Sequence, residues 1–171
     1  MKPFDFLQTT AKINHSGHRS QNSCSGYVNH RDESGIFARP ESTKICILYL
    51  EDEKDLVTLV QLIFSRQGYH IVGAHSIAQA KEIIERESID LFFLDLNLPD
   101  GTGWEMLDYL SHHAQYASTP KIIMSAQNSI QSGPTEVDNQ NRFSAIVSKP
   151  FQVNTLIDVT QRLLSRAKSS H

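Results

Sequence analysis

Five polar groups of this 171-residue chain stand at or just beyond the ends of short apolar runs, where their chemistry can be combined. Three are carboxylates, one is a hydroxyl and one is an ammonium group; they belong to Glu51, Asp52, Asp95, Ser125 and Lys149. In a parallel α/β sheet, ligands bind beyond the carboxyl ends of the strands, which share one edge. We therefore expect the five groups to converge there, in a set suited to a divalent metal ion and a phosphoryl group.

The carboxylates predict a metal site. Carboxylates that face one another repel, and ionising all of them is costly without a cation. Mg²⁺ prefers oxygen ligands, needs few protein carboxylates and fills its remaining positions with water or phosphate oxygens. We therefore expect Glu51, Asp52 and Asp95 to bind Mg²⁺, with the backbone carbonyl of Asn97 as a further ligand.

Asp95 is also a candidate nucleophile. A carboxylate can attack phosphorus to give an aspartyl phosphate, and phosphoryl transfer depends mainly on positioning and charge neutralisation. The Lys149 ammonium would hold one phosphoryl oxygen, and the Ser125 hydroxyl with nearby backbone N–H groups would hold another.

The neighbours of these residues favour the same interpretation. Gly101 and Gly103 permit a turn with unusual dihedral angles beside the site. Pro150 follows Lys149 directly and is compatible with a cis peptide bond, which would aim the lysine at the site.

Composition changes near residue 43 and divides the chain. Residues 1–43 are rich in Ser, Asn, Gln, His and Gly and show no apolar period, which predicts a mostly disordered extension. Residues 44–167 alternate short apolar runs with amphipathic stretches, as successive βα units do. Residues 168–171 form a short tail.

The elements that must position the five groups can be placed along this domain. The first helix is expected to have Leu56, Leu59, Val60 and Ile63 on one apolar stripe, and Ser76 to cap the second helix. A fourth helix within residues 126–142 should be short or loose, because the segment is polar and contains Gly-Pro. The predicted strands are residues 45–50, 69–74, 90–96, 121–124 and 143–147. Right-handed crossovers favour parallel pairing, so the predicted fold class is α/β with one doubly wound five-stranded parallel sheet.

Composition excludes several other classes. A formal net charge of -3 without a basic stripe gives no footprint for direct nucleic-acid binding. No apolar stretch approaches the roughly 20 residues that cross a membrane, and the N-terminus does not look like a secretory signal. Two cysteines without a framework of spacings favour a reduced, cytoplasmic location. The histidine pairs His15/His18 and His112/His113 lack partners at metal-ligand spacing.

Residues 44 to about 167 resemble the receiver domain of two-component response regulators, of the chemotaxis-Y-like kind. The matching pieces follow one another in the family's order and at its separations: Leu50-Glu51-Asp52-Glu53, Leu94-Asp95-Leu96-Asn97-Leu98-Pro99 with Gly103, Met124-Ser125-Ala126 and Lys149-Pro150-Phe151.

The resemblance implies a flavodoxin-like sheet with strand order 2-1-3-4-5 and a role for each site residue. Asp95 would be the phosphoacceptor for a phosphohistidine, and Glu51 and Asp52 would bind Mg²⁺. Ser125 would be the hydroxyl that moves towards the phosphate, and Lys149 its ammonium partner. One departure concerns Ile146, which stands where the family usually has Tyr or Phe. Phosphoryl chemistry should persist, while the aromatic switch as output signal is put in doubt.

Our leading functional hypothesis is a single-domain response regulator with an N-terminal extension, which is not an enzyme beyond its own phosphorylation and dephosphorylation. A sensor histidine kinase or histidine phosphotransfer domain would donate to Asp95. Output would pass to a downstream protein or by onward phosphotransfer, with neither DNA nor membrane bound directly, and the last two βα units offer a homodimer surface. One alternative is a receiver-like binding module that docks without phosphorylation. The other is a phosphatase of the haloacid-dehalogenase type, against which Asn97 argues because it cannot serve as the general acid.

Overall fold

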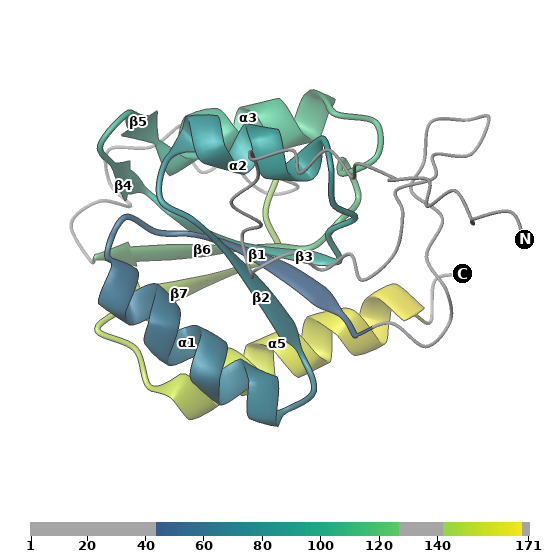
Figure 1. The fold of residues 1–171 in the computed structure, drawn as a ribbon. Helices are drawn as coiled ribbons and strands as arrows, with labels where there is room; N and C mark the ends of the chain where they lie inside the picture. The colour runs from purple at the N-terminus through teal and green to yellow at the C-terminus, as the bar shows by residue number, and fades with distance from the viewer. Residues whose placement is uncertain (1–43, 127–141, 169–171) are drawn as a thin grey trace, which may run out of the picture.

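The computed structural model describes residues 44–126 and 142–168. The predicted extension (residues 1–43) and most of the predicted fourth-helix segment lie outside the described residues. Within them, a parallel sheet is covered on one face by α2 (Ile77–Ile84) and α3 (Gly103–His112), and on the other by α1 (Lys54–Arg66) and α5 (Val153–Lys168), as Figure 1 shows. This is the predicted α/β architecture.

The sheet has five strands in the order β2-β1-β3-β6-β7, and all neighbouring pairs are parallel. The strands are β1 (Cys46–Leu50), β2 (His70–Ala74), β3 (Leu91–Asp95), β6 (Lys121–Ala126) and β7 (Ala145–Lys149). Counting only these strands, the order is the expected 2-1-3-4-5. The central strands β1 and β3 are buried along their whole length, which explains their nearly continuous apolar sequences.

The sheet separates two hydrophobic clusters. One lies under α2 and α3 and includes Leu48, Phe92 and Leu107; the other lies under α1 and α5 and includes Tyr49, Phe93 and Leu156. Side chains alternate between the faces along each strand, so adjacent residues of β1 and β3 contribute to opposite clusters. Both layers of helices therefore fix the position of the strand ends.

The predicted stripe of α1 is partly wrong. The buried residues are Val57, Val60 and Phe64, whereas Leu59 is 48% exposed. Positions three and four apart share a helix face, and Leu59 is one residue, about 100°, away from Val60. Leu59 is therefore an apolar residue at a solvent-facing position and not part of the core.

The last strand was also misplaced by two residues. We expected residues 143–147, but β7 runs from Ala145 to Lys149. Phe143 leaves the sheet and packs against the α2–α3 cluster, with its ring centroid 6.3 Å from that of Trp104. An apolar residue was counted as part of the strand although its partner lies on α3.

A small hairpin between β3 and α3 was not anticipated as sheet structure. It pairs β4 (Asn97–Leu98) with β5 (Gly101–Thr102) in antiparallel fashion. The hairpin leads directly into α3, where Thr102 forms a capping box with Glu105. At the start of α2, the predicted cap Ser76 accepts a hydrogen bond from the Gln79 N–H. No helix in the described ranges combines the length and apolar character that a membrane crossing requires.

Candidate functional site

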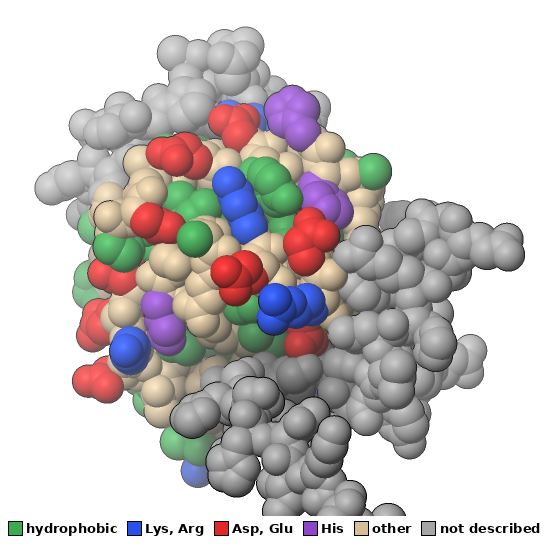
Figure 2. Space-filling view, turned by 45° about the horizontal axis from the view of Figure 1, so that its top comes forward, with side chains coloured by type: hydrophobic (Ala, Val, Ile, Leu, Met, Phe, Trp, Pro, Cys, Tyr) green, Lys and Arg blue, Asp and Glu red, His purple; other side chains and the backbone are tan. Residues whose placement is uncertain are grey.

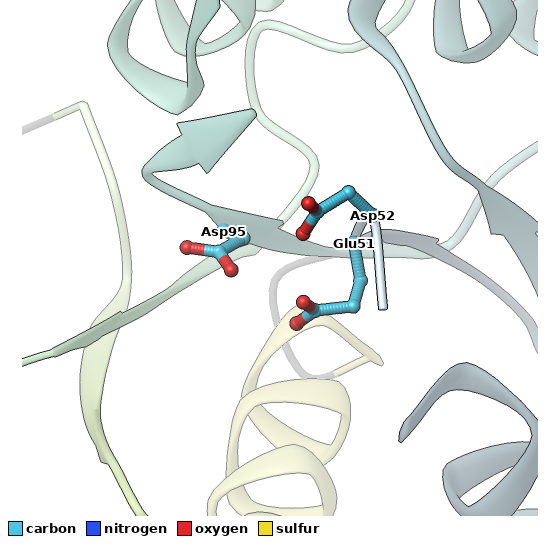
Figure 3. Close-up of side chains that lie close together, drawn as sticks. All are labelled: Glu51, Asp52 and Asp95. Carbon is cyan, nitrogen blue, oxygen red and sulfur yellow. The ribbon is translucent and has the colours of Figure 1, made fainter. Parts of the chain in front are cut away.

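The three predicted carboxylates lie together at the ends of two adjacent strands, as Figure 3 shows. Glu51 and Asp52 follow β1 directly, and Asp95 is the last residue of β3. One carboxylate oxygen from each of the three residues lies within 4.8 Å of the other two oxygens. Glu51 and Asp95 are only 2% and 5% exposed, whereas Asp52 is exposed to solvent.

Lys149 brings a positive charge to this cluster from β7, the strand at the edge of the sheet. It ends β7, two strands from β3, and its Nζ donates hydrogen bonds to both Glu51 and Asp95. Burial alone would lower the pKa of Lys149, but the bonds to these two carboxylates outweigh it and raise the pKa. The lysine is therefore charged at neutral pH and offsets part of the negative charge.

Tyr49 is a site neighbour that the sequence reasoning missed. Its hydroxyl donates to Glu51 Oε2 at 2.8 Å. Burial, followed by the adjacent Glu51 charge, raises the pKa of Tyr49. Burial also raises the pKa of Glu51, against the lowering effect of Lys149 and Tyr49. The sequence contains a sign of the contact between Tyr49 and Glu51, because side chains two residues apart on an extended chain point to the same side.

The other predicted residues occupy two further positions around Asp95. The Asn97 backbone N–H donates to Asp95 Oδ1 at 3.0 Å. Ser125 is fully buried on β6, one residue beyond the Met124 that pairs with Asp95. Its hydroxyl donates to the Ala126 carbonyl at 2.8 Å, so reaching a group on Asp95 would require this bond to be exchanged.

Glycine is needed at the two positions beside the site for different reasons. Gly101 adopts a φ of +155°, which disfavours a side chain. Gly103 has no positive φ, contrary to the expectation of unusual dihedrals. A Cβ on Gly103 would instead lie 2.1 Å from the Asp95 carbonyl oxygen, so this position needs glycine for close approach. The Lys149–Pro150 peptide bond is cis, as the sequence allowed.

The donor set fits a hard divalent cation. Three carboxylates and one ammonium group leave an excess of negative charge in a mostly buried place, and oxygen donors of this kind are those that Mg²⁺ prefers. The histidines form no comparable cluster in the described ranges: His112 Nδ1 lies 2.9 Å from the Asp108 carbonyl, and His113 faces Glu85. On the side covered by α2 and α3, acidic, basic and histidine side chains are interspersed (Figure 2).

Comparison with known proteins gives a consistent result. The family model described as the response regulator receiver domain matches residues 47–161. Among curated proteins, the chain is 28% identical over 133 residues to the transcriptional regulatory protein TrcR of Mycobacterium tuberculosis, covering 78% of this chain and 49% of that one. It is 30% identical over 125 residues to the transcriptional regulatory protein KdpE of Staphylococcus aureus, covering 73% and 52%. The chain thus spans about half the length of these relatives.

Solved structures show the same architecture. A CheY-like receiver domain protein from Methanospirillum hungatei superposes with a TM-score of 0.67 at 22% identity, over 75% of this chain and all of that one. A sensor protein from Polaromonas superposes with a TM-score of 0.64 at 28% identity, over 71% and 97%. The model match over residues 47–161 covers well over half of the sequence. This chain therefore belongs to the response regulator receiver domain family.

Proposed function

We propose that Asp95 accepts a phosphoryl group from a phosphohistidine in a Mg²⁺-dependent reaction. The observation that supports this most directly is the position of Asp95, clustered with two further carboxylates and in contact with the Lys149 ammonium. Receiver domains take phosphoryl groups from sensor kinases and generally bind Mg²⁺ at an acidic pocket. The donor would be a sensor histidine kinase or a histidine phosphotransfer domain, in the cytoplasm.

The transfer balances without any further reactant. A carboxylate oxygen of Asp95 attacks phosphorus, the phosphorus–nitrogen bond breaks, and the donor imidazole leaves with the bond's electron pair and takes up a proton. Glu51, Asp52, Asp95 and the Asn97 carbonyl would hold the metal ion, which supplies neutralisation of phosphoryl charge. Lys149 already contacts Asp95 and would pair with a phosphoryl oxygen.

The phosphoryl group gives Ser125 and Lys149 new partners. The Ser125 hydroxyl would leave the Ala126 carbonyl and donate to the phosphate, and this exchange would shift the end of β6. Ile146 on β7 is 39% exposed, so it offers an apolar contact to a downstream protein or to a second copy of the chain. Output through such a contact, or by onward phosphotransfer, does not need an aromatic residue at that position.

The test is phosphorylation by a small donor. The protein is incubated with Mg²⁺ and acetyl phosphate, and its intact mass is measured. We expect a gain of one phosphoryl group that is lost with EDTA and in Asp95→Asn, but kept in Asp55→Asn, a control acid in the first turn of α1. Absence of any gain in the unmodified protein would overturn the proposal and favour the phosphorylation-independent binding module. A gain that persists in Asp95→Asn would place the acceptor elsewhere.

A further inference from the structure

Asp100 connects the segment after the phosphoacceptor strand to another helix. It lies in the turn of the β4–β5 hairpin, five residues after Asp95. Its carboxylate accepts hydrogen bonds from the backbone N–H groups of Ile77 and Ala78, both at 3.0 Å. These are the first two residues of α2, whose N–H groups have no partner within the helix. Asp100 therefore caps α2 from 22 to 23 residues away.

The charge of Asp100 suits this position. The two backbone bonds lower its pKa, so it is ionised at neutral pH. A negative group is also favourable at the positive end of a helix. Next to it, the absent side chain of Gly101 lets the hairpin approach closely, since a Cβ there would lie 2.8 Å from Ile77 Cδ1. Both contacts hold the hairpin against the start of α2.

The start of α2 is joined in turn to the other side of the acidic site. The His75 N–H donates to Gln79 Oε1 at 2.7 Å, and His75 Nδ1 lies 2.9 Å from the backbone carbonyl of Glu51. The Glu51 N–H donates to the Ala74 carbonyl at 2.9 Å. The first turn of α2 is thus joined through His75 to the segment that supplies Glu51, and through Asp100 to the segment that follows Asp95.

The hairpin also positions Asn97. The Gly103 N–H donates to the Leu96 carbonyl, and Asn97 is the register partner of Thr102 in the hairpin. From this position the Asn97 N–H donates to Asp95 Oδ1 at 3.0 Å. Because the N–H and C=O of one strand residue point to the same side, the Asn97 carbonyl would face the same place, where the proposed metal ion would bind.

We propose that Asp100 is a positioning residue for the metal site: by fastening the hairpin to α2, it holds the Asn97 carbonyl and the Asp95 carboxylate in place relative to Glu51. This inference rests on the proposed Mg²⁺ site and adds a residue outside the acidic cluster. Loss of partners that hydrogen bond directly to a metal ligand weakens metal binding by roughly 10–100-fold. Asp100 acts one step further away, so we expect Asp100→Ala to raise the Kd for Mg²⁺ by about 3–10-fold.

Ser76→Ala is the matched control. Ser76 also caps α2, but its side chain accepts from the Gln79 N–H of the same helix, whereas Asp100 reaches α2 from the hairpin. Both substitutions remove a cap from the same helix, and only Asp100→Ala releases the hairpin. Asp100→Asn keeps one side-chain oxygen and should therefore lie between Asp100→Ala and the unmodified protein.

The experiment measures Mg²⁺ binding to the full chain by titration calorimetry, with urea unfolding of each variant to establish that it is folded. Weaker binding in Asp100→Ala, normal binding in Ser76→Ala and partial recovery in Asp100→Asn would support the inference. Equal binding in all variants would overturn it, and so would equal weakening in Ser76→Ala, because helix stability would then be the cause. If Asp100→Ala does not fold, Asp100→Asn against Ser76→Ala decides. Failure of the unmodified protein to bind Mg²⁺ would instead overturn the proposed metal site.

Discussion

Lys121 is a buried charge at the first residue of β6, three residues before the Met124 that pairs with the phosphoacceptor Asp95. It is 2% exposed, and its Nζ donates to the carbonyls of Tyr116, Ala117 and Thr119 at 2.7, 3.1 and 2.8 Å. These carbonyls belong to the segment that follows α3, so one side chain ties that segment to the sheet. Burial lowers the pKa of Lys121 to about 8.

We predict that Lys121→Met destabilises the fold and removes a pH dependence. The three carbonyls lose their donor, which should cost about 1–3 kcal/mol near neutral pH. Lysine has a pKa of 10.5 in the unfolded chain and about 8 here, so between these values the unfolded state binds more protons. Stability due to this group therefore rises with pH in that interval. Urea unfolding of both proteins at about pH 7 and about pH 9.5 checks this. The stability gap should widen with pH; a constant or narrowing gap would contradict the assignment.

At the scale of elements, α1 shows which of its apolar residues support the fold. Val60 is fully buried in the cluster under α1 and α5, while Leu59, its neighbour in sequence, is 48% exposed. We predict that Val60→Ala lowers the free energy of unfolding by about 1–3 kcal/mol, because it leaves a cavity. Leu59→Ala should change it by less than about 0.5 kcal/mol. Urea denaturation of the two variants measures both values, and a larger loss for Leu59→Ala would mean that α1 is rotated from the orientation described.

The topology of the sheet could be predicted because each strand and each helix is indicated by residues that are close together in the sequence. Each strand is a short apolar run, each described helix has its own apolar period, and the five site groups stand at or near strand ends, as Asp95 does after β3. The errors occur where a residue's environment depends on a distant segment. Phe143 joins Trp104 on α3 rather than β7, and Leu59 faces solvent although it is apolar.

The same distinction applies to the site. The residue types of Glu51, Asp95 and Lys149 and their places at strand ends were sufficient to predict that they meet. Asp100 could not be predicted as a helix cap, because nothing near it in the sequence indicates the backbone N–H groups of α2 that it caps. A hydrogen bond between a side chain and a backbone group far away in the sequence produces no spacing pattern in the sequence from which it could be predicted.

At the scale of the whole described domain, the acidic site lies at the edge of the sheet that separates the two hydrophobic clusters. Glu51 follows β1 and Asp95 ends β3, and both strands contribute residues to the clusters on either side of the sheet. The two strands that carry these carboxylates are therefore held by packing on both faces. Binding of a cation there should be measurable as a change in the stability of the entire fold.

We predict that Mg²⁺ stabilises the folded protein and that Asp52→Asn abolishes this effect. A ligand that binds only the folded state at ten times its Kd adds about 1.4 kcal/mol to the free energy of unfolding. Asp52 is exposed and the contacts of Lys149 go to Glu51 and Asp95 instead. Asp52→Asn should thus relieve repulsion between carboxylates, making the metal-free protein more stable while removing a ligand.

Thermal unfolding with EDTA and with Mg²⁺ measures both effects in one series. The Tm of the unmodified protein and of Asp55→Asn should rise with Mg²⁺ by several degrees, as about 1.4 kcal/mol implies for a domain of this size. The Tm of Asp52→Asn should start higher and stay constant. An equal rise in Asp52→Asn would contradict the prediction, because it would mean that Asp52 is not a ligand of the cation although its carboxylate lies beside those of Glu51 and Asp95.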